Sequence, residues 1–304
     1  IRDSNLPLIE VQHHHAHIAS VMAEAIATGQ LAPNARVLGI AFDGTGAGTD
    51  GTIWGGEFLV AGLADFERTA HLRTWALPGG AASVRDARRN AFALLSELDL
   101  LEHPGAAGLL GGLDEQTRSI TTTMVKRNIN SPRTSSMGRL FDAAAAILDI
   151  CGTATYEGEP AIELEAAAWR ALDSRTIRPI GDQAGALTPI DGSPVLDSQP
   201  LIEALLDGIE AGAPADRLAL DFHIAIARTS ARIASEICAR EGINTVALSG
   251  GVFMNRMLLR LLTCELRDVG LAVLVPHTVP VNDGCIAYGQ AAIARARLAQ
   301  AAPR

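Results

Sequence analysis

Histidines crowd one short segment near the start of the chain. Four of the eight histidines stand within five residues, at His13, His14, His15 and His17, and the small and apolar residues that follow, to residue 25, predict a helix. Residues four apart share one face of a helix, so His13 and His17 can direct two imidazoles at one ion. Imidazole is the commonest neutral ligand for zinc and iron-type ions near neutral pH. The segment predicts a metal site. A surface histidine run and a purification tag are the alternatives, and Ala16, which interrupts the run at the head of the helix, argues against the tag.

Two aspartates stand beside glycines in segments that could also carry chemistry. Asp43 follows an apolar run at residues 36–42, which is typical of a buried strand, and begins a glycine-rich tight turn predicted for residues 43–51. Its Asp43-Gly44-Thr45-Gly46 stretch is also a candidate phosphate loop. Asp283 stands at the predicted start of the last helix. An aspartate at a strand end next to glycines, as Asp43 is, can hold a cation or act as a nucleophile, but it can equally form an Asx-type turn. Asp283 could simply cap its helix.

Two further segments could bind a nucleotide. Ser249-Gly250-Gly251 joins a predicted strand to a predicted helix. Glycine there lets a ligand approach the backbone, and a helix start offers free N–H groups and a positive dipole end. The segment is neither a Walker loop nor GxGxxG, and a plain tight turn explains it equally well. Three carboxylates, Glu157, Glu159 and Glu163, surround Gly158. They could grip ribose hydroxyls or only charge the first turn of a helix.

The surrounding pattern indicates an α/β fold. Three successive strands, at residues 36–42, 52–60 and 68–75, predict an antiparallel meander. Residues 83–171 are mostly helical in pattern, and residues 177–200, rich in Pro, Gly and Asp, predict a loop or short hairpin. The last third alternates helices, strands and a glycine loop, which is typical of parallel strands. We expect three parts: an N-terminal lobe with the histidine helix and the meander (1–80), a helical middle segment with a loop hinge (81–200) and a C-terminal α/β nucleotide-binding lobe (201–304).

Composition narrows the class of protein. The 304 residues carry a net charge of −9 and include 48% hydrophobic residues. No apolar run reaches the roughly 18 residues that span a membrane, and no signal-peptide pattern begins the chain. Net acidity without a long Lys/Arg run argues against nucleic acid as a partner. Four cysteines without CxxC spacing indicate free thiols in a reducing cytosol. We expect a cytoplasmic protein, and the missing initiator methionine indicates a fragment of a longer one.

Seven motifs taken together resemble one known family. In family order they are His13-His14-His15-Ala16-His17, Asp43-Gly44-Thr45-Gly46, Trp54-Gly55-Gly56-Glu57, Ser136-Met137-Gly138-Arg139-Leu140-Phe141-Asp142, residues 154–163, residues 248–256 and Asn282-Asp283-Gly284. From about residue 8 to residue 299 the chain resembles the C-terminal domain of HypF, the carbamoyltransferase of [NiFe]-hydrogenase maturation. Seven motifs in order are far more specific than any one of them.

The resemblance implies the two-lobed actin-like ATPase (ASKHA) fold, with ribonuclease H-like lobes around a cleft and an N-terminal lobe that is incomplete here. It implies ATP or carbamoyl-adenylate held near a divalent metal, which His2Asp2 ligands allow to be Fe, Zn or Mn. The carbamoyl group would pass to the C-terminal Cys of the partner HypE and become the cyanide ligand of the hydrogenase iron. The implied catalytic and metal-binding residues are His13, His17, Asp43 and Asp283. With the glycine and carboxylate segments above, the expected nucleotide-binding residues are Gly44, Gly46, Asp142, Gly158, Glu159, Glu163, Gly250, Gly251 and Asn255, with Asp142 and Glu163 facing the ribose.

Proteins of this family carry acylphosphatase-like, zinc-finger and YrdC-like domains upstream of this region. We therefore expect the chain to receive or hydrolyse carbamoyl-adenylate made by an upstream YrdC-like domain rather than to make it. Cys285 stands where we expect a glycine, and packing is its expected role. Two related enzymes stay open: an antibiotic O-carbamoyltransferase, which shares the histidine pair and the fold, and the tRNA threonylcarbamoyladenosine transferase, which usually shows HxEGH in place of this chain's HHHAH. A nucleotide-binding scaffold is the non-enzymatic alternative.

Overall fold

The structure, a computed structural model, describes residues 8–173, 187–190 and 193–301. Its strands are β1 (Val37–Ala47), β2 (Ile53–Ala61), β3 (Phe66–Leu72), β4 (Trp75–Ala76), β5 (Arg133–Thr134), β6 (Leu187–Ile190), β7 (Ser193–Leu196), β8 (Thr245–Ser249) and β9 (Ala272–Leu274). Its helices are α1 (His13–Ala27), α2 (Ala81–Arg85), α3 (Ala87–Glu97), α4 (Ala107–Gly111), α5 (Glu115–Lys126), α6 (Met137–Ile147), α7 (Glu159–Asp173), α8 (Gln199–Glu210), α9 (Ala215–Glu241), α10 (Arg256–Asp268) and α11 (Ile286–Ala301).

One mixed sheet joins the described strands, in the order β6-β7-β3-β2-β1-β8-β9, with β5 paired to β2 and β4 paired to β5. The antiparallel pairs β1–β2 and β2–β3 confirm the expected meander. On the other side of β1, strand β8 pairs with it in parallel, and β9 pairs in parallel with β8. The parallel pattern predicted for the last third is therefore confirmed, and its strands continue the sheet that the meander begins.

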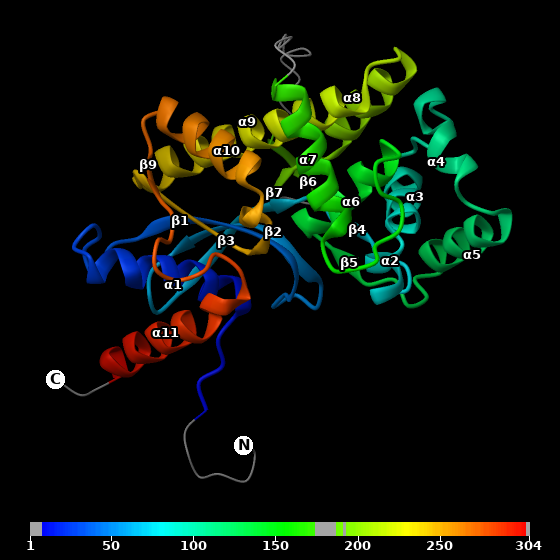
Figure 1. Ribbon diagram of the computed structural model, residues 1–304. Coiled ribbons are helices and arrows are strands. Elements are labelled where there is room, and N and C mark those ends of the chain that lie inside the picture. Colours follow the sequence, from blue (N-terminus) through cyan, green and yellow to red (C-terminus); the bar gives the residue numbers. More distant parts are fainter. Residues whose placement is uncertain (1–7, 174–186, 191–192, 302–304) are drawn as a thin grey trace.

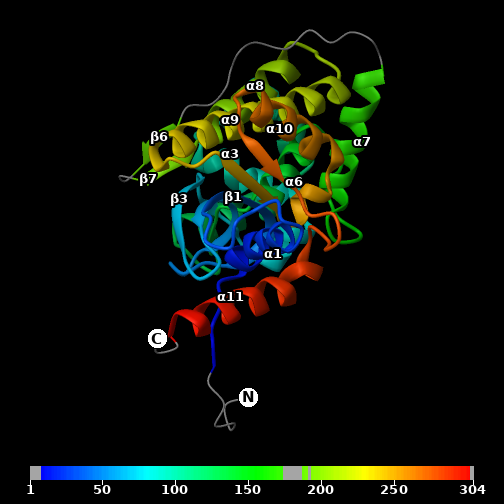
Figure 2. The ribbon, with the colours of Figure 1, turned by 90° about the vertical axis from the view of Figure 1, so that its left-hand side faces the viewer.

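Helices cover both faces of this sheet (Figures 1 and 2). Helices α1 and α11 lie together on one face, and α6 and α9 lie on the other. The side chains of β1 alternate accordingly, as expected for a strand with both faces buried. Leu38 and Phe42 belong to the large core that includes α6 and α9, whereas Val37 and Ala41 pack with residues of α1 such as Ile18.

Two glycines let helices approach their neighbours closely. A Cβ at Gly39 of β1 would overlap the side chain of Ile18, so α1 lies directly on the strand. A Cβ at Gly289 of α11 would overlap the backbone of Ala16 in α1. Helix α11 and the short 3-10 turn before it, Asp283–Cys285, are thereby held against α1. None of the described helices is long and apolar enough to cross a membrane.

The chain after Asp43 differs from the tight turn predicted for residues 43–51. Strand β1 continues to Ala47, with a shift of register between Phe42 and Gly46, because Trp54 and Ile53 of β2 supply pairing partners. The turn itself is confined to the next few residues, where the Gly48 N–H donates to the Thr52 carbonyl at 2.9 Å. Half of the hinge predicted at residues 177–200 lies outside the described residues. Its described part forms the β6–β7 hairpin and the start of α8.

Candidate metal centre and nucleotide cleft

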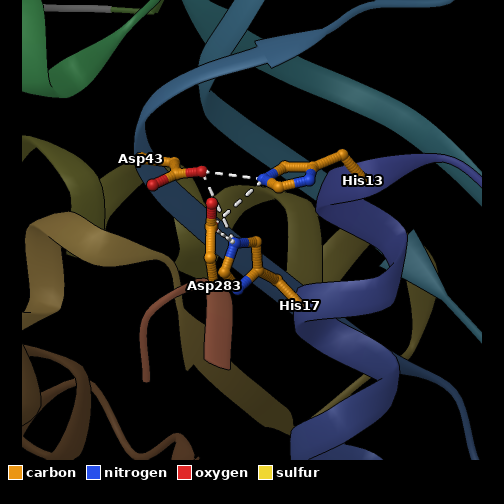
Figure 3. A group of neighbouring side chains, drawn as sticks. All are labelled: His13, His17, Asp43 and Asp283. Carbon is orange, nitrogen blue, oxygen red and sulfur yellow. Dashed lines mark hydrogen bonds and ion pairs between the residues drawn. The ribbon is translucent and has the colours of Figure 1, made fainter. Parts of the chain in front are cut away.

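Two histidines and two aspartates converge at one point, although 240 positions of sequence separate Asp43 from Asp283 (Figure 3). The Nε2 atom of His13 lies 3.0 Å from Oδ2 of Asp43 and 3.4 Å from Oδ1 of Asp283. The Nε2 atom of His17 lies 3.4 and 3.3 Å from the same two oxygens. The spacing of the histidines on one helix face thus brings both rings to the two carboxylates.

Local structure fixes each of these side chains. Gln12 caps α1 by accepting the His15 N–H at 2.8 Å, so the helix begins at His13. Asp43 lies at the irregularity in β1, and its Oδ1 accepts the Gly251 N–H at 3.0 Å. Gly46 leaves room for the histidines, because a Cβ there would come within 2.8 Å of the ring atoms of both His13 and His14.

The remaining nitrogen of the His17 ring is held as well. Its Nδ1 lies 3.2 Å from Oγ of Ser249 and 3.3 Å from Sγ of Cys285, and all three residues are fully buried. These contacts orient the ring so that Nε2 faces the carboxylates. Packing was the expected role of Cys285, and its thiol also contacts the His17 ring.

Charge interactions in the cluster are strong because His17 and Asp43 are buried. Burial lowers the pKa of His17, but contacts with Asp43 and Cys285 outweigh burial and raise that pKa to about 9. Burial opposes ionisation of Asp43, yet the hydrogen bond with His13 and the nearby charge of His17 hold its pKa well below the usual range. His14, beside this pair, stays neutral, since burial lowers its pKa to about 3.

The cluster has the dimensions of a metal site. Ligand atoms about 2.1 Å from a tetrahedral ion stand about 3.4 Å from one another, and the His–Asp distances are 3.0–3.4 Å. The buried Nε2 of His17 has no hydrogen-bond partner despite its short distances to the aspartates. A buried polar atom without a partner is costly, and a divalent ion among these four atoms would remove that cost.

A cleft of about 580 Å³ opens from the cluster and is large enough for a nucleotide. Asp43 and Asp283 lie in its wall at the metal cluster. Four of the residues expected to bind nucleotide also line it, namely Gly44, Gly158, Gly251 and Asn255. The cleft wall also includes Glu157, one of the three carboxylates considered for the ribose, and three residues that were not expected, Arg139, Glu165 and Met254.

The other expected nucleotide-binding residues lie elsewhere. Gly46 packs beneath the histidine rings, and Gly250 adopts a φ of 110° with Phe42 directly against it. Glu163 is exposed on α7, outside the cleft wall, and the Glu159 carboxylate accepts the Thr155 N–H at 2.5 Å. Asp142 is buried and faces the guanidinium of Arg139 at 2.9 Å rather than the open cleft.

The first N–H groups of α10 already donate to neighbouring side chains. The Asn255 Oδ1 accepts the Leu258 N–H at 2.9 Å, and Oε1 of Glu165 accepts the N–H groups of Arg256 and Met257 at 2.9 and 3.3 Å. Asn255 is held in turn by His223, whose Nε2 lies 2.9 Å from the amide nitrogen. Nothing in the local sequence identifies Glu165 or His223, because their partners lie 91 and 32 residues further along the chain.

A cluster of candidate metal ligands beside a nucleotide-sized cleft, on a mixed sheet with helices on both faces, indicates a domain of the actin-like ATPase class. Comparison with known families identifies the domain further. The family model "Carbamoyltransferase, Kae1-like Domain, second subdomain" of HypF matches residues 39–290, and the model "HypF Kae1-like domain" matches residues 1–24. The chain belongs to the HypF carbamoyltransferase family and is related to its C-terminal Kae1-like domain, which confirms the resemblance and the fold class expected from the motifs.

Individual relatives agree with this placement. A carbamoyltransferase HypF homolog of Cupriavidus necator is 38% identical, over 95% of this chain and 71% of its own length. The carbamoyltransferase HypF of Rhizobium leguminosarum bv. viciae is 39% identical, over 96% of this chain but 35% of its own length. A crystal structure of full-length HypF in its phosphate- and nucleotide-bound form superposes with a TM-score of 0.85 at 36% identity, over 98% of this chain and 44% of that one. The chain thus spans less than half of the Rhizobium protein and of the full-length HypF in the crystal structure, but 71% of the Cupriavidus homolog.

Proposed function

We propose that this domain transfers a carbamoyl group from carbamoyl-adenylate to the C-terminal cysteine of HypE, the step that leads to the cyanide ligand of [NiFe] hydrogenase. The observation that carries the proposal is the meeting of His13, His17, Asp43 and Asp283 at the end of a nucleotide-sized cleft. Membership of the HypF family supports the carbamoyl chemistry. An upstream YrdC-like domain would supply carbamoyl-adenylate.

The proposed reaction needs an acceptor from outside the chain. The thiol proton is released, the thiolate attacks the carbamoyl carbon, a C–S bond forms, and the bond from that carbon to the phosphate oxygen breaks, so that AMP leaves with its electron pair. A divalent ion, Fe, Zn or Mn, held by the four cluster residues would stabilise negative charge on the carbamoyl or phosphate oxygens. The chain itself binds the adenylate in the cleft and directs its carbamoyl end toward the cluster.

Reconstitution tests this proposal. The chain, loaded with Fe(II), Zn(II) or Mn(II), is mixed with a YrdC-like domain, carbamoyl phosphate, ATP and HypE, and intact-mass spectrometry follows the HypE C-terminus. We expect a carbamoyl adduct on wild-type HypE and none on HypE whose C-terminal cysteine is replaced by alanine. His13→Ala and His17→Ala should abolish both the adduct and metal binding.

A matched control comes from a distant histidine. His103 contacts Asp207 at 3.1 Å and lies outside the cleft wall, so His103→Ala should leave transfer unchanged. A chain that binds metal and nucleotide yet leaves HypE unmodified under every metal would be a scaffold. Adducts on an alcohol substrate or a tRNA adenosine, with none on HypE, would favour the related transferases instead.

A further inference from the structure

The cleft carries an excess of negative charge where the proposed ligand is also an anion. Carboxylates of Asp43, Glu157, Glu165 and Asp283 line it, and Arg139 is the one cationic side chain among the described residues of its wall. Like charges a few ångströms apart repel strongly away from bulk water. A divalent ion would offset Asp43 and Asp283 at one end of the cleft, and Arg139 is the side chain of the described wall that can offset a phosphate elsewhere in it.

The Arg139 side chain is built into the wall. It is 6% exposed, and its Nη2 lies 2.9 Å from Oδ2 of Asp142, a side chain that is 1% exposed. The Asn90 amide donates to the Arg139 carbonyl at 2.6 Å and anchors the backbone. The buried Nε–H of Arg139 nevertheless has no hydrogen-bond partner. A buried guanidinium with an unused donor at the edge of a cleft is suited to bind an anion.

Asp142 supplies the charge that keeps Arg139 in place. Burial raises the pKa of Asp142 to about 6, and the guanidinium opposes that rise. The carboxyl group is thus ionised at neutral pH and holds one side of the guanidinium fork. A buried charge left without its partner is strongly destabilising, so the two side chains depend on each other.

The backbone around Arg139 adds to the positive field. Ser136 caps α6 by accepting the Arg139 N–H at 3.1 Å, and its hydroxyl donates to the Asp43 carbonyl at 3.0 Å. A Cβ at Gly138 would stand 3.0 Å from Cα of Gly44, so the helix start lies against the phosphate-loop candidate. The N–H groups of Met137 and Gly138, at the first two helical positions, have no partner within the helix. A helix start of this kind attracts anions.

The glycine segment after β8 has fewer N–H groups available to bind a phosphate. The Gly251 N–H is occupied by Asp43, and the first N–H groups of α10 are occupied by Asn255 and Glu165. A fixed cation therefore stands beside N–H groups without partners in the helix at the start of α6, and not at the start of α10, which follows one of the two phosphate segments that the sequence offered.

We propose that the phosphate of the bound nucleotide is held at the first turn of α6, with Arg139 as its cationic ligand and Asp142 as the residue that positions Arg139. This inference rests on the nucleotide-binding part of the proposed function and on no other step of it. It replaces the ribose-facing role expected for Asp142.

Paired ligands that differ by the phosphate alone provide the test. Calorimetric titration of AMP and of adenosine into wild-type protein should show tighter binding of AMP. A hydrogen bond between charged groups accounts for about 10- to 100-fold in affinity. Arg139→Met should lose that factor for AMP and stay within about twofold for adenosine. Arg139→Lys, which keeps the charge but not the fork, should fall between.

The Asp142→Asn variant separates the two roles of that residue. As a positioning residue it should lower AMP affinity and spare adenosine, whereas a ribose contact would weaken both ligands. Arg133→Met is the matched control, because Arg133 pairs with Glu97 at 2.6 Å outside the cleft wall. Thermal unfolding shows that each variant is folded.

Three outcomes would overturn the inference: equal losses for AMP and adenosine in Arg139→Met, no loss for either, or no binding of AMP by the wild type at millimolar concentration. The proposed carbamoyl transfer can fail independently, since HypE would then stay unmodified while AMP binding still depended on Arg139.

Discussion

His223 shows how a single buried residue supports the cleft from behind. Its ring is fully buried in α9, with Nδ1 2.7 Å from the Ala219 carbonyl and Nε2 2.9 Å from the Asn255 amide. The carbonyl requires an N–H on Nδ1, so Nε2 accepts from Asn255. Burial lowers the pKa of His223 to about 4. The neutral ring thus orients Asn255, which caps α10 and lines the cleft.

Stability should fall as pH drops from about 6.5 to about 4 because of His223. In the unfolded chain its pKa is 6.5, so that chain takes up a proton in this window while the folded protein does not. Because only the unfolded state takes up this proton, the free energy of unfolding falls, by about 3 kcal/mol when the pH has reached 4. Urea unfolding at pH 7 and pH 4.5 measures it.

The matched variant for this prediction is His223→Gln, which cannot take up the proton. Its loss of stability between pH 7 and pH 4.5 should be smaller than that of the wild type. Equal losses in the two proteins would assign the pH dependence to other groups.

Metal affinity should depend on the two groups behind His17. Ser249 and Cys285 hold its Nδ1, and loss of such outer contacts typically costs about 10- to 100-fold in metal affinity. Cys285→Ala combined with Ser249→Ala should weaken zinc by that factor in a chelator competition. Cys238→Ala, a buried cysteine of α9 away from the cluster, should not. If the double variant bound zinc as tightly as the wild type, packing alone would be sufficient to orient the His17 ring.

The sequence predicted the site unevenly, for a physical reason. The i, i+4 spacing of His13 and His17 is local, so a helix alone brings them together. Asp43 and Asp283 entered through motif resemblance, since their approach depends on sheet and helix packing. Glu165 and His223 carried no signal, because burial and distant partners define what they do. Arg139 stands inside a matched motif, three positions before its partner Asp142, but the motif assigned it no role of its own.

At the level of elements, the local pattern predicted the three-stranded meander but not the full length of its first strand. Strand β1 runs to Ala47 through Gly44 and Gly46, residues with poor strand propensity. Pairing with Ile53 and Trp54 of β2 overrides that propensity. The extension matters for the site, because it holds Gly46 beneath the histidine rings and Asp43 at the irregularity of the strand.

The contact between α1 and α11 sets the distance from His17 to Asp283, and Gly289→Val should disturb it. A side chain at 289 would meet the Ala16 backbone and push α11 away from α1, at a cost of about 1–3 kcal/mol. Because Asp283 lies in the turn before α11, metal affinity should fall with stability. Chemical unfolding and zinc competition measure the two effects.

Ala291→Val is the control on the same helix, at an exposed position. It should change neither quantity by more than a small amount. A Gly289→Val protein with wild-type metal affinity would show that Asp283 is placed by its own turn and not by helix packing.

At the scale of the whole molecule, the sheet joins segments that the sequence assigned to different parts. Strand β8, from residues 201–304, pairs directly with β1, from residues 1–80. The main core likewise combines Leu38 and Phe42 with Leu148 and Leu262. The division into three parts stays a prediction about the order of the chain. Pairing between residues about 200 positions apart cannot be derived from local periodicity, because the spatial order of strands depends on the complete fold.

A shared sheet and core lead us to expect one cooperative unfolding transition. The three tryptophans, Trp54, Trp75 and Trp169, lie in β2, β4 and α7, so their fluorescence reports on the first two parts. Far-ultraviolet circular dichroism reports on all helices, including α9, α10 and α11.

Loss of β1 would expose the edge of β8 and the apolar face of α1, so neither end of the chain should persist without the other. The two signals should share one midpoint in urea, and added zinc should shift both together, because binding to the folded state alone stabilises all of it. Separate midpoints, or a folded fragment of residues 201–304, would show that the C-terminal segment is an independent unit and that the four metal ligands meet across a domain boundary.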